Sequence, residues 1–301
     1  MITINIIGAG RLGKTIGKLI VNNKAGEIQA ICNQSLSSST RASMYIGAGE
    51  PVENINDLPP ADLTLISTSD ENINCVAKNL ARSPALKKGS VALHCSGALT
   101  SAELSTLKEK NCLTCSVHPM HSFASPDISV SKFKGTYCAV EGDDEAVNLS
   151  IKIFSAIGGI TYRIDSDKKT KYHASGVIAS NYLVTLCHQA QKCLESTGVE
   201  PELAMKIITS LMQGTVDNLS STLSSKNSLT GPIKRGDVGT VSRHLSAISD
   251  SSSLQEFYRQ MGLLTLDIAN NDPIINSRLV ELLDSAKYDQ NQTPKPSPAY
   301  P

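Results

Sequence analysis

This sequence of 301 residues has no excess of either charge, because its 28 lysines and arginines balance its 28 aspartates and glutamates. Because no net field then draws the chain toward phosphate backbones or anionic lipids, neither nucleic acid nor a membrane surface is expected as a partner. Long apolar runs are lacking too. The longest apolar helical stretch, at 177–187, is interrupted by polar residues and is too short to span a bilayer. No basic segment followed by an apolar one opens the chain, so no secretory signal is expected.

Cysteine is also scarce, with 8 residues in the whole chain. This number is too small for a disulfide scaffold at this length, and most of the cysteines lie in apolar runs. We therefore expect free thiols and a cytoplasmic protein. No internal repeat of solenoid period is present. A chain of this length usually exceeds one hydrophobic core, so two domains are expected.

The pattern of apolar residues changes along the chain. Residues 1–165 alternate short β-branched runs with helical segments, which is typical of a parallel sheet with crossover helices. Strands are predicted at 2–7, 27–32, 62–67, 90–95, 112–117, 136–140 and 160–164. Residues 166–288 have helical periodicity only, and the proline-rich end at 289–301 is predicted to be a disordered tail. The predicted fold class is α/β, with a sheet domain followed by an all-α domain.

A glycine motif opens the sheet domain. Gly8, Gly10 and Gly13 follow the first strand in G-x-G-x-x-G spacing, with Arg11 and Leu12 between the second and third glycines. Glycine here permits a tight turn, close backbone approach to a pyrophosphate and close packing of helix on strand. The helix that begins here would offer its amides and its positive dipole end to the phosphates. These residues predict a Rossmann-like dinucleotide site.

The end of the second strand bears on which dinucleotide is bound. Enzymes that use NAD place an acidic residue about 20 positions beyond the glycines, to hold the ribose 2′-hydroxyl. Here Asn33 occupies that position, and residues 33–43 contain no Asp or Glu but include Ser35 and Arg41. Hydroxyls and a cation suit a 2′-phosphate, which a carboxylate would repel, so NADP is predicted. A solvated serine turn that caps the next helix is the alternative.

Polar residues follow the later strands as well. Ser67 and Thr68 follow one strand, His94 and Ser96 the next, and His118 and His121 the one after. Open α/β sheets bind ligands at the carboxyl ends of their strands, so a polar cluster is expected on the cofactor's side.

A metal site is the other interpretation of this cluster. It would use Cys112, Cys115, His118 and His121. On a strand, however, positions 112 and 115 point to opposite faces, and Pro119 restricts the loop. No metal is predicted.

One helical stretch, at 167–186, combines small apolar residues with a polar stripe. Lys169, His173 and Ser180 fall within about 40° of one another around a helix, with Gly176 between them and Asn181 beside them. The stripe indicates either a functional face or the exposed side of an amphipathic helix.

The sequence resembles one family through five motifs in order. These are GAGRLG at 8–13, LHCSGAL at 93–99, HPMHSF at 118–123, KTKYHASGVIASNYLVTL at 169–186 and LTGPIKRGD at 229–237. Together they resemble the family that joins a Rossmann-like domain to a helical domain named DUF2520. The sequence is similar, more distantly, to pyrroline-5-carboxylate reductase, ketopantoate reductase and the 3-hydroxyisobutyrate and 6-phosphogluconate dehydrogenases. The resemblance implies an oxidoreductase that uses NADP and pairs as a homodimer through its helical domain.

The resemblance also implies roles for the stripe. In the dehydrogenase and ketopantoate reductase relatives, a lysine with an asparagine four residues later projects toward the nicotinamide. Lys169 and His173 stand in this relation, with histidine in place of asparagine; Lys171 with Ser175 is a competing assignment.

The predicted reaction is hydride transfer from NADPH to the carbonyl of a small 2-oxo acid, and ketopantoate is the leading substrate by resemblance. Lys169 would stabilise and protonate the oxygen, and His173 would orient the substrate or share the proton relay. Substrate contacts are predicted for Ser96, His118, Ser180, Asn181 and Arg235, and cofactor contacts for Gly8, Gly10, Arg11, Leu12, Gly13, Asn33, Ser35, Arg41, Ser67, Thr68 and His94. For Arg235 and Asp237, a surface salt bridge with helix capping is the alternative.

Two rival functions remain at this stage. One is reduction of a cyclic imine of the pyrroline-5-carboxylate type. The other is a regulatory protein that binds NADP without turnover, because fold alone does not separate these functions.

Overall fold

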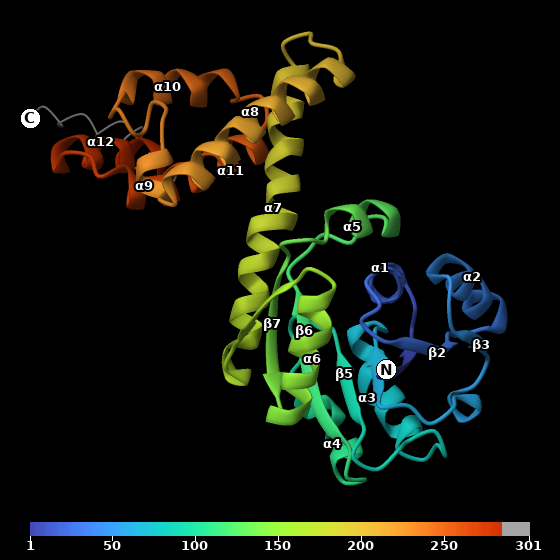
Figure 1. The fold of residues 1–301 in the computed structure, drawn as a ribbon. Coiled ribbons are helices and arrows are strands. Elements are labelled where there is room, and N and C mark those ends of the chain that lie inside the picture. Colours follow the sequence, from blue (N-terminus) through green and yellow to red (C-terminus); the bar gives the residue numbers. More distant parts are fainter. Residues whose placement is uncertain (285–301) are drawn as a thin grey trace, which may run out of the picture. The chain divides into compact units, whose positions relative to one another are not determined.

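The computed structural model describes residues 1–284, which form two compact units (Figure 1). The first unit is Met1–Asn181 and the second begins at Tyr182. The division lies within a long helix, because the first turns of that helix pack on the sheet. The predicted boundary between residues 165 and 166 lies instead shortly after the last strand, which ends at Arg163. The tail predicted at 289–301 lies outside the described residues.

The first unit is built on a single eight-stranded sheet. Its strand order is β3-β2-β1-β4-β5-β6-β7-β8. All seven predicted strands are present, and β3 is an addition. The bounds are β1 (Thr3–Ile7), β2 (Glu27–Cys32), β3 (Glu50–Val52), β4 (Leu63–Ile66), β5 (Val91–His94), β6 (Leu113–Pro119), β7 (Tyr137–Gly142) and β8 (Ile160–Arg163).

The sheet is mostly parallel, with one antiparallel pair. Strands β1 to β6 run in the same direction, whereas β7 is antiparallel to β6 and parallel to β8. The order places β2 and β3 on one side of β1 and β4 to β6 on the other. The chain therefore adds strands to one side of β1 first and to the other side afterwards. Open α/β sheets bind ligands at such a reversal of strand order, here between β1 and β4.

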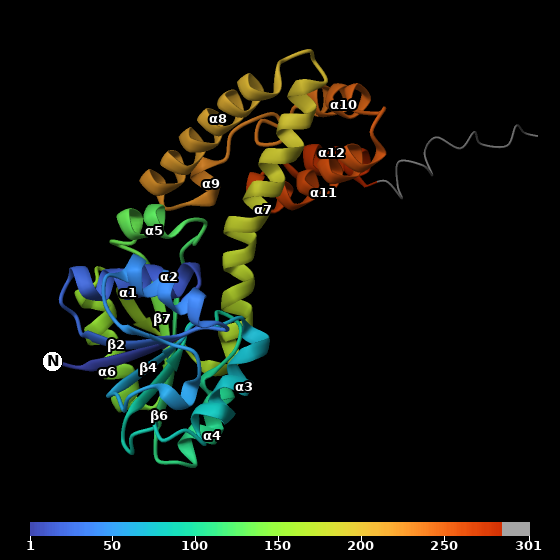
Figure 2. The same cartoon turned by 90° about the vertical axis from the view of Figure 1, so that its right-hand side faces the viewer.

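Helices cover both faces of this sheet (Figure 2). Apolar side chains of α1 (Arg11–Asn22), α2 (Leu36–Ile46) and α6 (Asp144–Ala156), with Phe133 at the end of α5 (Pro126–Lys132), form the core on one face. On the other face the core is formed by α3 (Asp70–Leu80) and α4 (Ser105–Lys108), with Leu104 of the 3-10 turn η2 (Ser101–Leu104). Two further 3-10 turns are η1 (Ile55–Asp57) and η3 (Ser166–Lys168).

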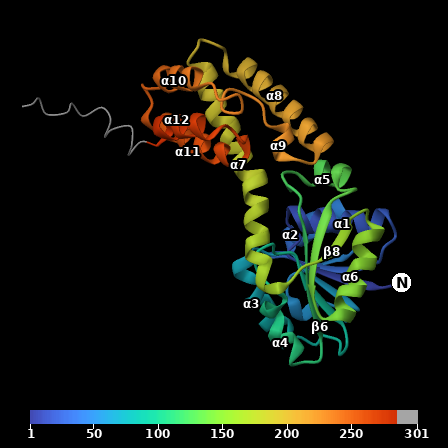
Figure 3. The same ribbon diagram turned by 90° about the vertical axis from the view of Figure 1, so that its left-hand side faces the viewer.

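The longest helix, α7 (Lys169–Glu195), begins in the first unit and ends in the second. The remaining helices are α8 (Pro201–Thr222), α9 (Ser225–Ser228), α10 (Val238–Ala247), α11 (Ser252–Ala269) and α12 (Pro273–Leu283) (Figure 3). Side chains of α10, α11 and α12 form the core of the second unit, with Val241, Leu245, Leu279 and Leu283 buried. The all-helical second half is thus confirmed.

Two expectations from composition can be checked directly. No helix within residues 1–284 has the length and apolar character needed to cross a membrane. The cysteines are free thiols, as predicted, and most of them are buried.

Candidate functional site

The glycine loop after β1 is fixed by tight packing at two of its three glycines. Gly8 has φ +87°, and a β-carbon there would lie 2.8 Å from the backbone nitrogen of Thr68. A β-carbon at Gly13 would lie 3.1 Å from the carbonyl oxygen of Gly8. Both positions therefore need glycine for the fold itself, since the first has a left-handed backbone and the second a close approach of helix to strand.

Gly10 differs from the other two glycines. A β-carbon at this position would meet no protein atom within 4 Å, and φ is −75°. Gly10 is the N-cap of α1, and no side chain caps this helix. Neither packing nor a positive φ therefore requires glycine at this position, but close approach of a ligand to the backbone would.

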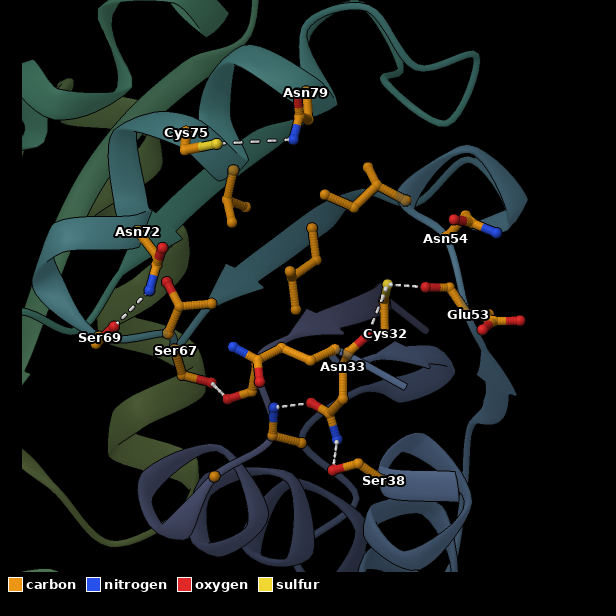
Figure 4. Close-up of a pocket in the computed structure, with 18 of the residues that line it drawn as sticks. Cys32, Asn33, Ser38, Glu53, Asn54, Ser67, Ser69, Asn72, Cys75 and Asn79 are labelled. Atoms are coloured by element: carbon orange, nitrogen blue, oxygen red, sulfur yellow. Dashed lines mark hydrogen bonds between the residues drawn. The ribbon is translucent and has the colours of Figure 1, made fainter. Parts of the chain in front are cut away.

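A cavity of about 730 Å³ lies beside this loop, at the carboxyl ends of β1, β2 and β4 (Figure 4). It is lined by Gly8, Gly10, Asn33, Ser67 and Thr68, for which the sequence predicts cofactor contacts. The hydroxyl of Thr68 is buried without a hydrogen-bond partner in the described residues. The uncapped amides at the start of α1, beside the cavity, fit a polar, phosphate-bearing ligand such as a dinucleotide.

Asn33 connects the glycine loop to the end of β2 through hydrogen bonds. Its side-chain oxygen accepts a hydrogen bond of 2.6 Å from the backbone nitrogen of Ala9, and its side-chain nitrogen donates to Ser38 Oγ at 3.3 Å (Figure 4). Ser35 caps α2 by accepting a bond from the backbone nitrogen of Ser38, as the alternative interpretation of the serine turn expected. Arg41 is exposed. The contacts predicted for Arg11, Leu12, Ser35 and Arg41 stay predictions, because none of the four lines the cavity.

Part of the cavity wall was missed at the sequence level. The segment after β3 contributes Glu53, Asn54, Ile55 and Asn56, and α3 contributes Asn72, Cys75, Val76 and Asn79, with Arg82 just after this helix. Strand β3 has only three residues and contains Pro51, which an edge strand tolerates. So short a strand gives no periodic signal, and the residues after it could not be placed at the sheet edge.

A second polar region lies further along the same sheet edge, where a row of buried polar residues crosses three strands. His94 of β5 is paired with Ser116 of β6, which is paired with Glu141 of β7. Lys169, in the first turn of α7, is 1% exposed and contacts this row. Its Nζ lies 3.1 Å from Oε1 of Glu141 and also donates to Ser116 Oγ. The ammonium is thus held in a buried ion pair.

This ion pair holds the first turn of α7 against the sheet. Burial lowers the pKa of the Lys169 ammonium, and the attraction of Glu141 opposes this effect. Glu141 also accepts hydrogen bonds from the backbone nitrogen and the hydroxyl of Ser101, at 2.9 Å and 2.8 Å. Lys171 is exposed, so Lys169 is the lysine that points inward. Its contacts suit an anchor, and its catalytic role stays a prediction.

His94 and Ser96 are both occupied by contacts within the protein. His94 is fully buried; its Nδ1 accepts from the backbone nitrogen of Ser96 at 3.2 Å, and its Nε2 lies 3.0 Å from the carbonyl oxygen of Thr100. Ser96 Oγ donates to Asp70 at 2.8 Å and accepts from the backbone nitrogens of Ala98 and Leu99. These contacts use the hydrogen-bonding capacity of both side chains. The ligand contacts predicted for His94 and Ser96 stay predictions. Every polar atom of these two side chains already has a partner within the protein.

The burial of His94 predicts acid sensitivity. Burial, helped by the charge of Lys169, lowers the pKa of His94 from 6.5 to about 4. Between these values the unfolded chain binds a proton that the folded chain does not, so stability falls as the pH falls from 6.5 toward 4. We expect this histidine to contribute up to about 3 kcal/mol to the loss. Chemical denaturation at several pH values measures the free energy of unfolding. Its slope against pH should be shallower for His94→Gln than for wild type. His188→Gln, at an exposed position, should keep the wild-type slope; equal slopes for all three proteins would contradict the assignment.

His118 and His173 meet above the loop that follows β5. Their ring centroids are 5.7 Å apart in an edge-on arrangement. A β-carbon at Gly97 would lie 2.8 Å from Nε2 of His118 and would also collide with the ring of His173. Nδ1 of His118 lies 2.9 Å from the hydroxyl of Tyr172. The structure therefore brings His118 and His173 together at the carboxyl end of β6, with Tyr172 as a partner that the sequence did not indicate.

The remaining predicted substrate residues lie further along the chain. Ser180 and Asn181 are exposed neighbours on α7, and Arg235 is exposed in the second unit. Asp237 caps α10 and accepts bonds from the backbone and the hydroxyl of Thr240 at 2.9 Å and 2.7 Å, which lowers its pKa. The capping part of the alternative interpretation is confirmed. The ligand contacts of Ser180, Asn181 and Arg235 stay predictions.

The residues of the alternative metal site have other partners. Cys112 donates to the carbonyl oxygen of Ser90 at 3.0 Å, and Cys115 lies 3.1 Å from Ser150 Oγ. His121 packs edge-on against Phe123. Over residues 1–284, no three side chains of the types that bind metals come together.

Comparison with known proteins gives two family matches. Residues 1–119 match the Rossmann-like domain, and residues 136–265 match the domain of unknown function DUF2520. No curated protein matches the chain.

Several solved structures share the fold over most of the chain. A Bacteroides fragilis protein, provisionally named an NADP oxidoreductase, is 19% identical with a TM-score of 0.73, and the match covers 88% of this chain and 98% of that one. A Thermotoga maritima protein whose name states no activity is 27% identical, with a TM-score of 0.69 and the same coverage. A pyrroline-5-carboxylate reductase from Coxiella burnetii is 17% identical, with a TM-score of 0.60, over 89% of this chain and 97% of that one.

The order of the two matched domains agrees with the mostly parallel sheet and the helical second half described above. The five motifs that suggested the resemblance lie at the glycine loop, at the ends of β5 and β6, on α7 and ahead of α10. The chain therefore combines a Rossmann-like domain with a DUF2520 domain, in the order of the family that its sequence resembles.

Proposed function

We propose that the protein is an NADPH-dependent reductase that transfers hydride to the carbonyl carbon of a small 2-oxo acid, with ketopantoate, reduced to pantoate, as the leading substrate. The observation that carries the proposal is the cavity beside Gly10, where the backbone is exposed to a ligand and no side chain of the protein fills the space. The choice of ketopantoate depends on the sequence resemblance.

The residues at the cavity suit a phosphorylated dinucleotide. The amides at the start of α1 would bind the pyrophosphate. The adenosine half would extend toward Asn33 and Ser38, near the uncharged start of α2. Glu53 is the acidic residue of the cavity wall, and it comes from the segment after β3 rather than from the position that normally selects NAD. The name of the Bacteroides fragilis protein also supports NADP.

Bound NADPH would supply the hydride, and a proton from the protein or solvent would neutralise the substrate oxygen, giving NADP⁺ and a 2-hydroxy acid. The other half of the dinucleotide is expected over β4 to β6, because the adenosine half lies on the β2 side of β1. His118 and His173 lie at the end of β6. Nearby hydrogen-bond donors stabilise the charge that develops on a carbonyl oxygen during hydride transfer.

Two other functions are compatible with the same cavity. Reduction of a cyclic imine is supported by the fold shared with the Coxiella burnetii enzyme. A regulatory protein that binds NADP without turnover would need the cavity but no substrate. Both are outcomes of the experiment below.

The test is NADPH oxidation measured against ketopantoate, other branched 2-oxo acids and pyrroline-5-carboxylate. We expect turnover with ketopantoate; turnover with the imine alone would favour imine reduction, and tight NADPH binding without any turnover would favour the regulatory role.

The cofactor preference is tested separately with Asn33→Asp. A carboxylate at the end of β2 should repel a 2′-phosphate and lower the preference for NADPH over NADH about tenfold or more, equivalent to about 1.4 kcal/mol. Asn148→Asp, exposed on α6 and absent from the cavity wall, is the charge-matched control and should keep the wild-type ratio. An unchanged ratio in Asn33→Asp would contradict the proposed position of the 2′-phosphate.

The expected partners and compartment are also proposals. Large apolar residues are exposed on α8, among them Leu203 at 53% and Leu211 at 69%. Such exposure favours a homodimer that buries this helix, and light scattering should give twice the mass of one chain. A cytoplasmic location is proposed from the free thiols and the substrate class.

A further inference from the structure

We infer that the hydroxyl of Ser38 is the hydrogen-bond donor that recognises the 2′-phosphate of NADPH, and that Asn33 is a positioning residue that keeps this hydroxyl free for the ligand. Ser38 lies in the first turn of α2 and lines the cavity beside Gly10. The inference rests on the dinucleotide site proposed above, and it does not depend on the substrate.

The orientation of the Asn33 side chain is fixed by its contact with the glycine loop. The backbone nitrogen of Ala9 lies 2.6 Å from the end of this side chain, and a backbone N–H can only donate. The atom that faces Ala9 must therefore be the carboxamide oxygen, because the carboxamide nitrogen is a donor as well. The Asn33 nitrogen then faces the other way, toward Ser38 (Figure 4).

The orientation of Asn33 decides the role of Ser38. The Asn33 nitrogen lies 3.3 Å from Ser38 Oγ, and since a carboxamide nitrogen accepts no hydrogen bond, the hydroxyl oxygen is the acceptor. The hydroxyl proton is therefore not used in this contact. Within residues 1–284 this proton has no other acceptor, so it is available to a ligand in the cavity.

The free atoms of this pair suit a group that is rich in acceptors. Ser38 offers its O–H and Asn33 its second N–H, while the carboxamide oxygen is bonded to Ala9. A ribose 2′-hydroxyl needs an acceptor for its own proton, which NAD enzymes supply with a carboxylate at the end of β2. An ionised 2′-phosphate has acceptors only, and hydrogen bonds to a charged group are the stronger kind. The pair therefore favours NADPH over NADH.

No cation lies beside this pair in the cavity wall. Arg82 is the one lysine or arginine among the described residues that line the cavity, and it follows α3 rather than β2. Figure 4 shows Asn79, in the last turn of α3, far from Ser38 across the cavity. Arg41, on α2, is exposed and does not line the cavity. The hydroxyl of Ser38 is therefore the group on α2 that is placed to recognise the phosphate.

Dissociation constants for NADPH and NADH test the role of Ser38 without any turnover. Ser38→Ala should weaken NADPH binding about tenfold, because one hydrogen bond to a charged group is lost, and leave NADH binding nearly unchanged. Unchanged NADH binding also shows that the cavity is intact. Ser37→Ala is the matched control, since Ser37 is exposed on the same helix and does not line the cavity. A wild-type ratio in Ser38→Ala, or an equal loss for both dinucleotides, would overturn the inference.

A double variant tests the positioning role of Asn33. In Asn33→Asp one carboxylate oxygen still accepts from Ala9, and the other faces Ser38 Oγ and takes its proton. Adding Ser38→Ala to Asn33→Asp should therefore change NADPH affinity by no more than about twofold. A further tenfold loss in the double variant would overturn the positioning role.

Two fragments separate this inference from the proposed function, because they contain the adenosine half alone. Wild type should bind adenosine 2′,5′-bisphosphate about tenfold more tightly than adenosine 5′-monophosphate, and Ser38→Ala should remove the difference. This result is expected even if no substrate is turned over, in which case only the reductase proposal fails. Equal binding of the two fragments by wild type would overturn the inference and leave the reductase proposal standing.

Discussion

Replacing Gly10 by alanine should weaken NADPH binding about tenfold or more while leaving the fold intact. The added methyl group meets no protein atom within 4 Å, and φ at Gly10 is −75°, outside the left-handed region that favours glycine. The loss in unfolding free energy should stay below about 1 kcal/mol, because alanine is only a poorer N-cap than glycine. Quenching or enhancement of NADPH fluorescence on titration measures the affinity, and chemical denaturation measures the stability.

Gly8→Ala is the contrasting variant. Its β-carbon would lie 2.8 Å from the backbone of Thr68 at φ +87°, so this change should destabilise the fold by about 1–3 kcal/mol or more. The two variants thus separate a glycine needed for the fold from one needed for the ligand. Wild-type affinity in Gly10→Ala would contradict a pyrophosphate at the start of α1.

Lys169→Ala should be strongly destabilising. The change leaves the carboxylate of Glu141 buried, 3% exposed, without its cation. Removal of one partner of a buried ion pair costs about 3–5 kcal/mol, which is a large part of the stability of a typical domain. The shift in the midpoint of urea denaturation measures this loss when the m-value, the dependence of the unfolding free energy on urea concentration, is the same in both proteins.

Lys171→Ala, two residues along and exposed, is the control and should change stability by no more than about 0.5 kcal/mol. Two outcomes separate the possible roles of Lys169. Lower stability with activity that falls only as far as the folded fraction falls supports an anchor. Normal stability with a large loss of kcat would contradict the anchor and return Lys169 to the catalytic role that the sequence predicted.

Much of the first unit could be predicted from sequence because its signals are local. The strands before Gly8 and Ser67 are apolar runs with sharp ends, and the glycine spacing places a turn and a helix start at known residues. Strand β3 has three residues and left no such signal. The direction of β7 was not predictable either, because a short connection through α5 allows either direction and only pairing with β6 decides it.

The candidate site was predicted less completely, since its key contacts join distant parts of the chain. Lys169 and His173 of the stripe both contact residues of the sheet, but the stripe left a functional face and an exposed side open, and it could not show that Glu141 would receive the ammonium. Glu141 lies in an apolar strand, where a lone carboxylate gives no sign of its partner. Tyr172 was missed for a similar reason, because its contact with His118 spans 54 positions of sequence.

The most direct measurement uses NADPH that carries deuterium at C4 of the nicotinamide, in both stereochemical forms, with ketopantoate as the acceptor. Mass spectrometry of the product should show one deuterium on C2 of pantoate from one of the two forms. NADPH oxidation without deuterium in the product, or no oxidation by a folded protein that binds NADPH, would contradict hydride transfer to this carbonyl.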